Sequence, residues 1–363
     1  MRAAIYNPYL DTLGGGERYT LTFAQILGSL GYEVDIEWSS NTISPKKFWQ
    51  PDFVRQRRTP TKLEYKKFES RFGLNLEGLR FVKDIRRGDG YDICFWVSDG
   101  SVPLLRAHRN FLHFQYPFKD VNGRSLINKM KFFRIDKIIC NSFFTKDFID
   151  QEYGVNSLVI YPPVDTSKFK PKRKENIILF VGRFSQLTQA KNQHVLVDAF
   201  KRLAKLKTNP WKLVLAGGAE VGSDSYLKKL EKSGLHRNVE IVRSPSFSDL
   251  KELYGKAKIF WSAVGYETNI NKEPQKSEHF GISVIEAMSA GAVPLVFDAG
   301  GYREIISDGI NGFLWKTVSN LIKGTKKLIG DEALLRHLSK QAKEDSQIYE
   351  YARFEAEVLE ILE

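Results

Sequence analysis

The feature that most constrains this chain is an alternation of short apolar runs with segments of helical periodicity, which continues through most of its 363 residues. Runs such as Ala3-Ala4-Ile5-Tyr6 are typical of strands, whereas residues 18–30 place their apolar side chains on one helical face. Parallel strands need long crossover connections, which are usually helices. The alternation therefore predicts an α/β protein with parallel sheets covered by helices.

A proline-rich segment at 161–171 divides this pattern into two halves, and we expect neither a helix nor a central strand there. Before it, we expect strands at 3–6, 33–36, 92–97, 111–114, 137–141 and 158–161, and a helix at 18–30 that Gly31 ends in a left-handed conformation. After it, strands at 177–181, 212–216, 239–242, 259–262 and 292–296 alternate with helices at 192–206, 224–233, 248–257 and 281–290, and a tail that is helical throughout covers 332–363. We therefore expect two doubly wound domains, over 1–165 and 166–345, that face a central ligand-binding cleft at the carboxyl ends of both sheets.

Composition narrows the class of protein further. The longest apolar runs fall short of the ~18 residues that a membrane-spanning helix needs, and the N-terminus turns polar too quickly for a signal peptide. Cys94 and Cys140 lie inside apolar runs, and two cysteines make neither a disulfide framework nor a four-cysteine zinc site. We therefore expect buried thiols and a reducing, cytoplasmic setting.

Net charge is the feature that departs most from the average. The formal charge is +12, and residues 45–90 contribute thirteen Lys and Arg against six acids, together with several large aromatic residues. Such a charge favours an anionic partner: nucleic acid, an acidic membrane face or phosphorylated metabolites. The alternative is a solvated surface above core aromatics, and the two interpretations remain open from this stretch alone.

A triple glycine, Gly14-Gly15-Gly16, follows the first expected strand and opens the first expected helix. Small residues at a helix N-terminus leave backbone amides free to approach a phosphate. The third glycine of a dinucleotide-binding fingerprint would fall at Tyr19, so that motif is absent. A P-loop is absent as well, because Ser223 stands where the lysine is required.

The second half begins with an arrangement that favours phosphate binding. Its first strand ends in Gly182-Arg183, and Lys191-Asn192 stands at the start of the next expected helix. Arginine pairs with two phosphate oxygens at once, and lysine adds a point charge. Taken alone, these residues are equally consistent with two surface cations in a basic protein.

A third motif supports the ligand-binding interpretation. Glu278 lies in an expected loop, Gly281-Ile282 leaves backbone amides free at a helix start, and Glu286 lies inside that helix about two turns along from Glu278. From these positions Glu286 can reach a ribose while Glu278 reaches a second group. The strand that follows leads into Gly300-Gly301-Tyr302-Arg303-Glu304.

Over nearly its whole length the chain resembles glycosyltransferase family 4, retaining enzymes of the GT-B fold. The resemblance rests on the glycine-rich first turn, Asn141-Ser142, the Tyr-Pro-Pro-Val-Asp linker, Val-Gly-Arg with Lys-Asn downstream, Leu-Ala-Gly-Gly, the Glu-x7-Glu segment and Gly-Gly-x-x-Glu. The strings Gly-Gly-Gly-Glu-Arg, His-Phe-Gln-Tyr-Pro at 113–117 and Glu-His-Phe-Gly also resemble the mannosyltransferases of lipid-linked oligosaccharide assembly. The spacing from Arg183 to Lys191 is longer than is usual in the family.

The resemblance implies a role for each matching residue. It assigns the donor pyrophosphate to Arg183 and Lys191, the hydroxyls of the donor sugar to Glu278, and the ribose to Glu286. It also implies that backbone near the sugar and phosphate comes from Phe280, Gly281 and Ile282, that Gly15, Gly16 and Gly182 line the donor site, and that His113 lies beside the sugar. In the GT-B fold the last helix usually returns to the first domain, so we expect this of residues 346–363.

The implied activity is retaining transfer of a sugar, mannose from GDP-mannose, to a glycan or polyprenyl-linked acceptor. Cations and helix-start amides would stabilise the leaving nucleoside diphosphate, and because the chain lacks an Asp-x-Asp pair we expect neither a metal nor any other cofactor. A UDP-sugar donor and a nucleotide-sugar epimerase are the enzymatic alternatives. A basic nucleic-acid-binding protein is the non-enzymatic alternative, but it leaves the Glu-x7-Glu segment unexplained, so we expect no nucleic-acid partner.

The acceptor implied by the resemblance connects the activity to a membrane. An anionic leaflet attracts polybasic segments, and aromatic side chains settle at its interface. We therefore expect peripheral binding at the inner face of the cell membrane through the 45–90 stretch, with Arg57, Arg58, Lys66 and Lys67 among the contributors.

Overall fold

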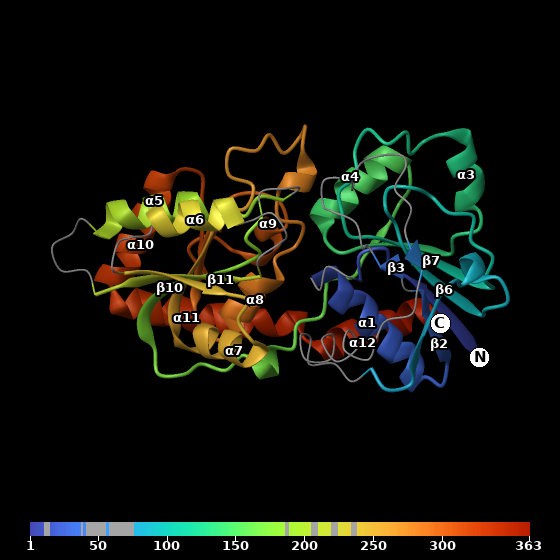
Figure 1. The fold of residues 1–363 in the computed structure, drawn as a ribbon, viewed down its shortest axis with the longest axis horizontal. Helices are drawn as coiled ribbons and strands as arrows, with labels where there is room; N and C mark the ends of the chain where they lie inside the picture. Colours follow the sequence, from blue (N-terminus) through green and yellow to red (C-terminus); the bar gives the residue numbers. More distant parts are fainter. Residues whose placement is uncertain are drawn as a thin grey trace. The chain divides into compact units, whose positions relative to one another are not determined.

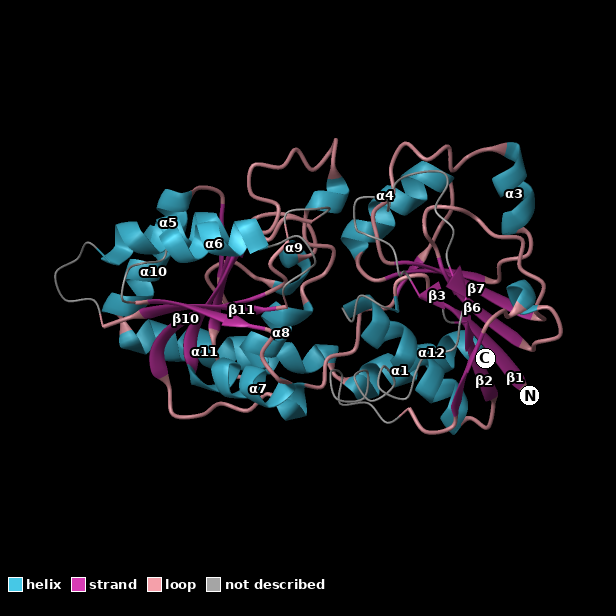
Figure 2. Ribbon diagram, in the orientation of Figure 1, coloured by secondary structure: helices cyan, strands magenta, loops and turns pink. Residues whose placement is uncertain are grey.

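The fold was examined in a computed structural model, which describes residues 1–10, 15–37, 39–40, 56–57, 76–185, 189–204, 210–218, 224–233 and 238–363. The chain divides into two compact units. The N-terminal unit comprises Met1–Pro163 together with Tyr351–Glu363, and the C-terminal unit comprises Val164–Glu350. Each unit is built around one parallel sheet with helices on both faces, as Figure 2 shows by colour.

The sheet of the N-terminal unit has seven strands in the order β5-β2-β1-β6-β7-β8-β9. They are β5 (Leu79–Val82), β2 (Glu33–Glu37), β1 (Arg2–Tyr6), β6 (Ile93–Val97), β7 (Arg109–Phe114), β8 (Lys137–Cys140) and β9 (Leu158–Val159). All neighbouring pairs run parallel. The order reverses at β1, which is the point where ligands bind in doubly wound sheets.

Side chains along β1 alternate between two apolar clusters, as the period of two in a strand requires. Ala3 and Ile5 pack with α1 (Gly15–Ser29) and α12 (Tyr351–Leu362), whereas Ala4 and Tyr6 pack on the opposite face. That opposite face carries α3 (Leu126–Phe132) and α4 (Phe143–Tyr153), which appear on the other side of the sheet in Figure 1. Cys94 and Cys140 are buried on this face as free thiols, as the sequence predicted.

The sheet of the C-terminal unit has six parallel strands in the order β12-β11-β10-β13-β14-β15. They are β12 (Val239–Arg243), β11 (Lys212–Gly217), β10 (Glu175–Val181), β13 (Ala257–Ser262), β14 (Val293–Phe297) and β15 (Phe313–Trp315). The order repeats that of the first sheet, with the reversal at β10. The two sheets confirm the expected pair of doubly wound architectures.

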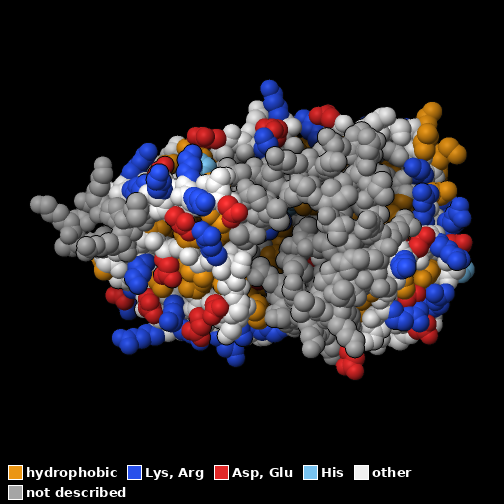
Figure 3. Space-filling view, in the orientation of Figure 1, with side chains coloured by type: hydrophobic (Ala, Val, Ile, Leu, Met, Phe, Trp, Pro, Cys, Tyr) orange, Lys and Arg blue, Asp and Glu red, His pale blue; other side chains and the backbone are white. Residues whose placement is uncertain are grey.

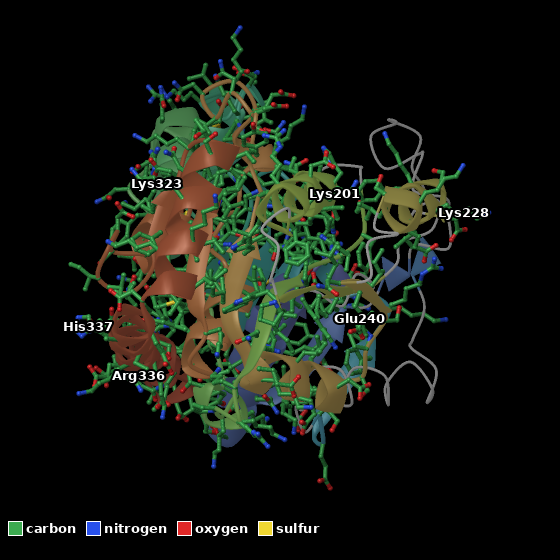
Figure 4. All side chains as sticks on the ribbon, turned by 90° about the vertical axis from the view of Figure 1, so that its left-hand side faces the viewer. Lys201, Lys228, Glu240, Lys323, Arg336 and His337 are labelled. Carbon is green, nitrogen blue, oxygen red and sulfur yellow. The ribbon has the colours of Figure 1, made fainter. Side chains whose placement is uncertain are left out.

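Helices cover both faces of this second sheet. One face carries α5 (Gln193–Ala204), α6 (Asp224–Ser233) and α10 (Val318–Gly330), and the other carries α7 (Phe247–Lys256), α8 (Ile282–Ser289) and α11 (Glu332–Ser346). Figure 4 shows charged side chains pointing outward from these helices, with Lys201 on α5, Lys323 on α10 and Arg336 on α11. A short helix, α9 (Tyr302–Ile305), follows β14.

The C-terminal helix α12 belongs to the N-terminal unit. Its buried residues Phe354, Val358 and Ile361 join the core formed by β1 and α1, and the Tyr19 ring meets the edge of the Phe354 ring at 4.8 Å between centroids. The guanidinium of Arg109 donates to the carbonyls of Ile361, at 2.9 Å, and of Leu362, which suits a cation at a helix C-terminus.

The structure corrects several expected boundaries. The tail is two helices, because Gln347–Tyr349 form a turn of 3-10 helix and Glu350 is extended, so α12 begins at Tyr351 and not at 346. Helix α5 begins at Gln193, since Asn192 adopts a left-handed conformation with φ of 52°. The linker contains a single 3-10 turn at Thr166–Lys168. Gly31 ends α1 with φ of 82°, as predicted.

The basic 45–90 stretch lies largely outside the described residues, and so do the side chains of Arg57, Arg58, Lys66 and Lys67 and residue Gly14. Its described end contributes the edge strand β5, where Arg80 pairs with the buried Asp35. Within the described ranges, no helix combines the length and apolar character needed to cross a membrane.

Candidate functional site

The predicted phosphate-binding residues of the C-terminal unit lie just beyond the carboxyl end of β10. Gly182 directly follows β10, and its backbone packs tightly against Gly217 at the end of β11. A Cβ on Gly217 would stand 2.0 Å from the Gly182 carbonyl oxygen. The Gly182 amide donates to Ala216 at 2.9 Å, and Gln193 donates to the Arg183 carbonyl at 2.8 Å. Two strand ends and the start of α5 thus fix the backbone on which Arg183 is mounted.

Lys191 is held at the end of the same loop by a defined set of partners. Its ammonium donates to Gln189 Oε1 at 2.7 Å and to Glu278 Oε2 at 3.1 Å. The side chain of the next residue, Asn192, donates to the carbonyl of Ala263 at 3.1 Å. Ala263 directly follows β13, so this hydrogen bond joins the loops that follow the neighbouring strands β10 and β13. Two of the three ammonium hydrogens of Lys191 therefore have partners among the described residues.

Glu278 is the centre of this group of side chains. The Glu278 and Lys191 side chains are only 16% and 13% exposed, and the Tyr302 hydroxyl donates to Glu278 Oε2 at 3.4 Å. Burial has the largest single effect and raises the pKa of the Glu278 carboxyl, but the charges of Lys191 and His279 and the hydrogen bonds from Lys191 and Tyr302 together leave the pKa below its usual value. The adjacent His279 is buried, which lowers its pKa to about 4. At neutral pH the site holds an ionised carboxylate beside an ammonium and a neutral imidazole.

Two glycines after β14 place the Glu278 loop. A Cβ on Gly300 would stand 2.2 Å from the Glu278 carbonyl oxygen, and one on Gly301 would stand 2.5 Å from Cα of Phe280. The Gly301 amide donates to the Glu278 carbonyl at 2.8 Å. Gly300 also has φ of 60°, a conformation that glycine adopts without strain. The Gly-Gly-x-x-Glu motif therefore acts as a backbone support for Glu278.

The backbone at Phe280, Gly281 and Ile282 forms the N-terminus of α8. Gly281 is the residue before the helix, with φ of 124°, and it packs on the Tyr302 ring. Phe280 is buried with its ring against Tyr349 at 5.4 Å between centroids. The first amides of a helix are free of partners within the helix and carry partial positive charge. This helix end follows Glu278 directly in the chain.

Glu286 lies within α8, four residues after its first residue Ile282, and is only 8% exposed. Its carboxylate accepts a hydrogen bond from the Tyr254 hydroxyl of α7 at 2.8 Å. Both acids of the Glu-x7-Glu segment thus accept a hydrogen bond from a tyrosine hydroxyl, Glu278 from Tyr302 and Glu286 from Tyr254.

In the N-terminal unit, Gly15 and Gly16 form the first turn of α1. A Cβ on Gly16 would stand 1.7 Å from Gln115 Oε1, so the side chain of Gln115 fills the space that the glycine leaves. His113 stands two residues earlier, at the end of β7, and is fully buried. Its ring stacks on the Tyr19 ring at 4.3 Å between centroids. The structure thus brings Gly16, Tyr19, His113 and Gln115 together.

Among the described residues, several buried polar atoms of this second group lack a well-formed hydrogen bond: Tyr19 Oη, both ring nitrogens of His113 and Gln115 Oε1. Burial lowers the pKa of His113 to about 3, although the Ile139 backbone acts in the opposite direction. Folded proteins satisfy nearly all buried polar atoms, so a concentration of unsatisfied ones marks an unusual place.

Tyr302, Gln189, Tyr254, Tyr19 and Gln115 were not predicted as site residues. Two of them stand beside predicted motifs, since Tyr302 follows Gly300-Gly301 and Gln115 follows His113 by two positions. The sequence places Tyr19 on the apolar face of the first expected helix, at the position where a dinucleotide fingerprint would need its third glycine. A single sequence offers no signal for Tyr254, whose contact with Glu286 joins residues far apart in the chain.

Comparison with protein families assigns the chain. Residues 164–345 match the model described as "Glycosyl transferases group 1", and residues 13–168 match the model described as "Glycosyltransferase Family 4". The chain belongs to this family of glycosyltransferases. The matched segments meet at the linker between the two units and carry every residue of both groups described above.

Several curated relatives are mannosyltransferases of modest identity. The O-antigen chain mannosyltransferase RfbU of Salmonella typhimurium is 30% identical over 236 residues, 62% of this chain and 61% of its own. The GDP-Man:Man(3)GlcNAc(2)-PP-Dol alpha-1,2-mannosyltransferase of Dictyostelium discoideum is 24% identical over 233 residues, 60% of this chain and 44% of its own. The matched part of the chain therefore spans between 44% and 61% of the length of these two relatives.

A solved structure shows the same fold along the whole chain. Anabaena Alr3699/HepE, crystallised in complex with UDP, superposes with a TM-score of 0.75 over 100% of this chain and 99% of that one, at 16% identity. Together with the two parallel sheets, this likeness confirms the GT-B fold that the sequence resemblance implied.

Proposed function

We propose that this family member is a retaining glycosyltransferase that moves mannose from GDP-mannose to a glycan or lipid-linked acceptor. The observation that carries the proposal is the Lys191–Glu278 pair, 3.1 Å apart, beside the N-terminus of α8. A cation, an ionised acid and free helix amides in one place suit a donor that has phosphates at one end and sugar hydroxyls at the other.

In this proposal each residue has a separate task. Arg183 and Lys191 bind the pyrophosphate, and the third ammonium hydrogen of Lys191 serves the phosphate oxygens. Glu278 accepts hydrogen bonds from the sugar hydroxyls, Glu286 accepts them from the ribose, and the backbone at Phe280, Gly281 and Ile282 donates to sugar and phosphate. Gly182 admits the phosphates to the end of β10.

The family resemblance assigns donor contacts to Gly15, Gly16 and His113 of the N-terminal unit as well, and we include these residues in the proposal. Neutral His113, with Tyr19 and Gln115, offers buried hydrogen-bonding atoms that lack a well-formed partner among the described residues. A donor sugar that displaces Gln115 from Gly16 would supply partners for them.

The proposed chemistry follows from charge. Breaking the bond between sugar and phosphate leaves negative charge on the nucleoside diphosphate while the sugar becomes oxocarbenium-like. Cations and oriented amides that are already in place stabilise this charge without reorganisation. We propose that the departing phosphate takes the proton of the acceptor hydroxyl, which attacks from the same face and retains the configuration.

A screen of nucleotide sugars tests this function. We expect GDP-mannose, in preference to UDP-sugars, to raise the melting temperature and to be hydrolysed slowly without acceptor.

Glu278→Gln and Arg183→Ala should each lower transfer by about 10²–10³-fold with an unchanged fold. Glu231→Gln breaks a surface pair with Arg243 in the same unit and is the matched control. Activity of either site variant within threefold of wild type would remove that residue from the site, and release of free epimerised sugar would favour an epimerase.

We also propose that transfer needs no metal ion or other cofactor. Arg183, Lys191 and the α8 N-terminus supply positive charge where a divalent cation otherwise stabilises the leaving phosphates. Transfer should therefore continue at its full rate in EDTA. Inactivation by EDTA that manganese or magnesium reverses would contradict this.

The lipid-linked acceptor places the enzyme, in this proposal, on the cytoplasmic face of a membrane as a peripheral protein without a nucleic-acid partner. Support comes from the basic composition of the chain and from the lipid-linked substrate in the printed name of the Dictyostelium relative. Salt-dependent binding to anionic vesicles, without comparable binding to RNA or DNA, is the expected result.

A further inference from the structure

Helix α3 of the N-terminal unit has apolar side chains on two sides. On the inner side, Phe132 meets the Tyr153 ring edge-on at 6.1 Å between centroids and packs with Ile135 on a buried cluster. On the outer side, Leu126, Ile127, Met130 and Phe133 are 78%, 66%, 71% and 91% exposed. Apolar side chains on the solvent side of a short helix are not needed for its packing in the core, so this outer set is available for another contact.

The four exposed residues form one continuous face, which we call the α3 face. Leu126, Met130 and Phe133 are spaced by four and three residues, and Ile127 lies three residues before Met130, so all four project from the same side of the helix. Figure 3 shows hydrophobic side chains standing out from the surface over this helix. Few soluble proteins present such a cluster unless it contacts a partner.

The backbone below the α3 face is held firmly. Ser125 caps the helix by accepting from the Asn128 amide, and Glu152 of α4 accepts from the amides of Asp120, Val121 and Gly123 in the preceding loop. Arg124 adds two hydrogen bonds to the Gln151 carbonyl. The exposed face is therefore a fixed part of the fold.

Positive charge surrounds the α3 face. Residues 119–134 contain five Lys and Arg and a single acid, Asp120. Lys129 and Arg134 are exposed, and Lys131 turns inward to donate to the Val102 carbonyl at 2.8 Å. Figure 3 shows blue side chains next to the apolar ones. An apolar row bordered by cations is complementary to an anionic lipid interface, where acyl chains lie beneath negative headgroups.

We propose that the α3 face inserts into the interface of an anionic bilayer. The proposal rests on the proposed function, because a lipid-linked acceptor gives the N-terminal unit a reason to lie on a membrane, and it names a surface separate from the 45–90 stretch. Met130 and Phe133 enter the acyl boundary, and Lys129 and Arg134 pair with headgroup phosphates.

Flotation with vesicles tests the proposal. The full chain is mixed with vesicles of phosphatidylglycerol and phosphatidylcholine, or of phosphatidylcholine alone, at low and high salt. Wild type should bind the anionic vesicles, and the double variant Met130→Ser/Phe133→Ser should bind at least about tenfold more weakly at both salt concentrations. Lys129→Glu should weaken binding mainly at low salt. The matched control is Ile310→Ser/Ile348→Ser, which removes exposed apolar side chains from the C-terminal unit and should bind like wild type.

Two readouts separate the surface from the activity. Hydrolysis of a soluble nucleotide sugar reports the donor site, and the double variant should retain it; a wild type that binds vesicles but hydrolyses no nucleotide sugar would refute the proposed function and leave the surface in place. Equal vesicle binding by wild type and the double variant would overturn the membrane proposal. So would self-association of wild type in solution that the double variant abolishes, without vesicle binding by either, because a second copy would then be the partner.

Discussion

At the scale of single residues, the position of the Glu278 backbone depends on glycines that contribute no side chain. The clearest case is Gly300, whose missing Cβ leaves room for the Glu278 carbonyl. Gly309 is also left-handed, with φ of 76°, but a Cβ there would meet nothing within 4 Å. Replacing Gly309 by alanine therefore costs only backbone strain, whereas replacing Gly300 adds a steric clash with the Glu278 carbonyl.

We therefore predict different outcomes for Gly300→Ala and Gly309→Ala. Both replace a left-handed glycine and should lose about 1 kcal/mol of stability. Gly300→Ala must also displace the Glu278 backbone, so it should destabilise further and reduce hydrolysis of the donor at least about tenfold. Thermal melting and donor hydrolysis measure the two effects, and equal behaviour of the variants would show that Gly300 does not support Glu278.

His113 makes the stability of the N-terminal unit depend on pH. Its pKa is about 3 in the folded protein against an ordinary value near 6.5, so between these values the unfolded chain binds a proton that the folded chain does not. Stability is therefore complete above pH 6.5 and falls as the pH drops, by about 1.4 kcal/mol per pH unit.

The prediction is that His113→Phe, which keeps an aromatic ring against Tyr19, removes most of the stability loss between pH 7 and pH 5. Hydrogen exchange of β7 peptides across a urea titration follows this unit separately from the C-terminal unit, where His279 acts in the same direction. His108→Phe alters an exposed histidine of the same unit and should leave the loss unchanged. A full loss in His113→Phe would mean that the ring is not the group that titrates.

At the scale of elements, α12 completes the core of the N-terminal unit. Phe354 and Val358 have no exposed surface, whereas Leu359 on the same helix is 37% exposed. We predict that Phe354→Ala destabilises this unit by about 3–5 kcal/mol, and that Leu359→Ala costs far less. Proteolysis of α1 and β2 under mild denaturant measures the effect. A chain truncated after Ser346 should show the larger loss, and its unchanged melting and activity would count against this role of α12.

The sequence predicted most of the strands, but it missed the edge strand β5 and the break between α11 and α12. Strands β1, β2, β6 and β10 carry long apolar or alternating runs, and their periodicity identifies them. The edge strand β5 was missed because Leu79–Val82 mixes exposed Arg80 with apolar residues in a basic stretch. The break at Glu350 was missed as well, since nothing in Gln347-Ile348-Tyr349-Glu350 opposes helix formation locally.

The same division applies to the candidate site. Gly182, Lys191 and Glu278 follow strands or precede helices, and such positions are visible in one sequence. The partners Tyr302, Gln189 and Gln115 come into contact only through tertiary structure, because strand order and crossovers decide which loops meet. The burial of His113 is also a product of packing, by Tyr19 above its ring.

At the scale of the whole molecule, the proposed donor site implies that nucleotide binding affects one unit more than the other. We predict that GDP protects the segment after β10 and the start of α8 from hydrogen exchange. At one hundred times its dissociation constant it should stabilise the C-terminal unit by about 2.7 kcal/mol. Protection confined to α10 and α11, without change at α8, would contradict the placement of the phosphates.

The return of α12 has a consequence for biosynthesis. Residues 1–163 are synthesised well before residues 351–363, so their core lacks Phe354, Val358 and Ile361 until that later segment is made. The C-terminal unit is contiguous and can fold while the earlier residues wait, a delay on the order of ten seconds at ordinary rates of synthesis. During that interval the face of α1 and β1 that α12 later covers is open to chaperones, so the nascent chain should depend on them more than the order of its residues implies.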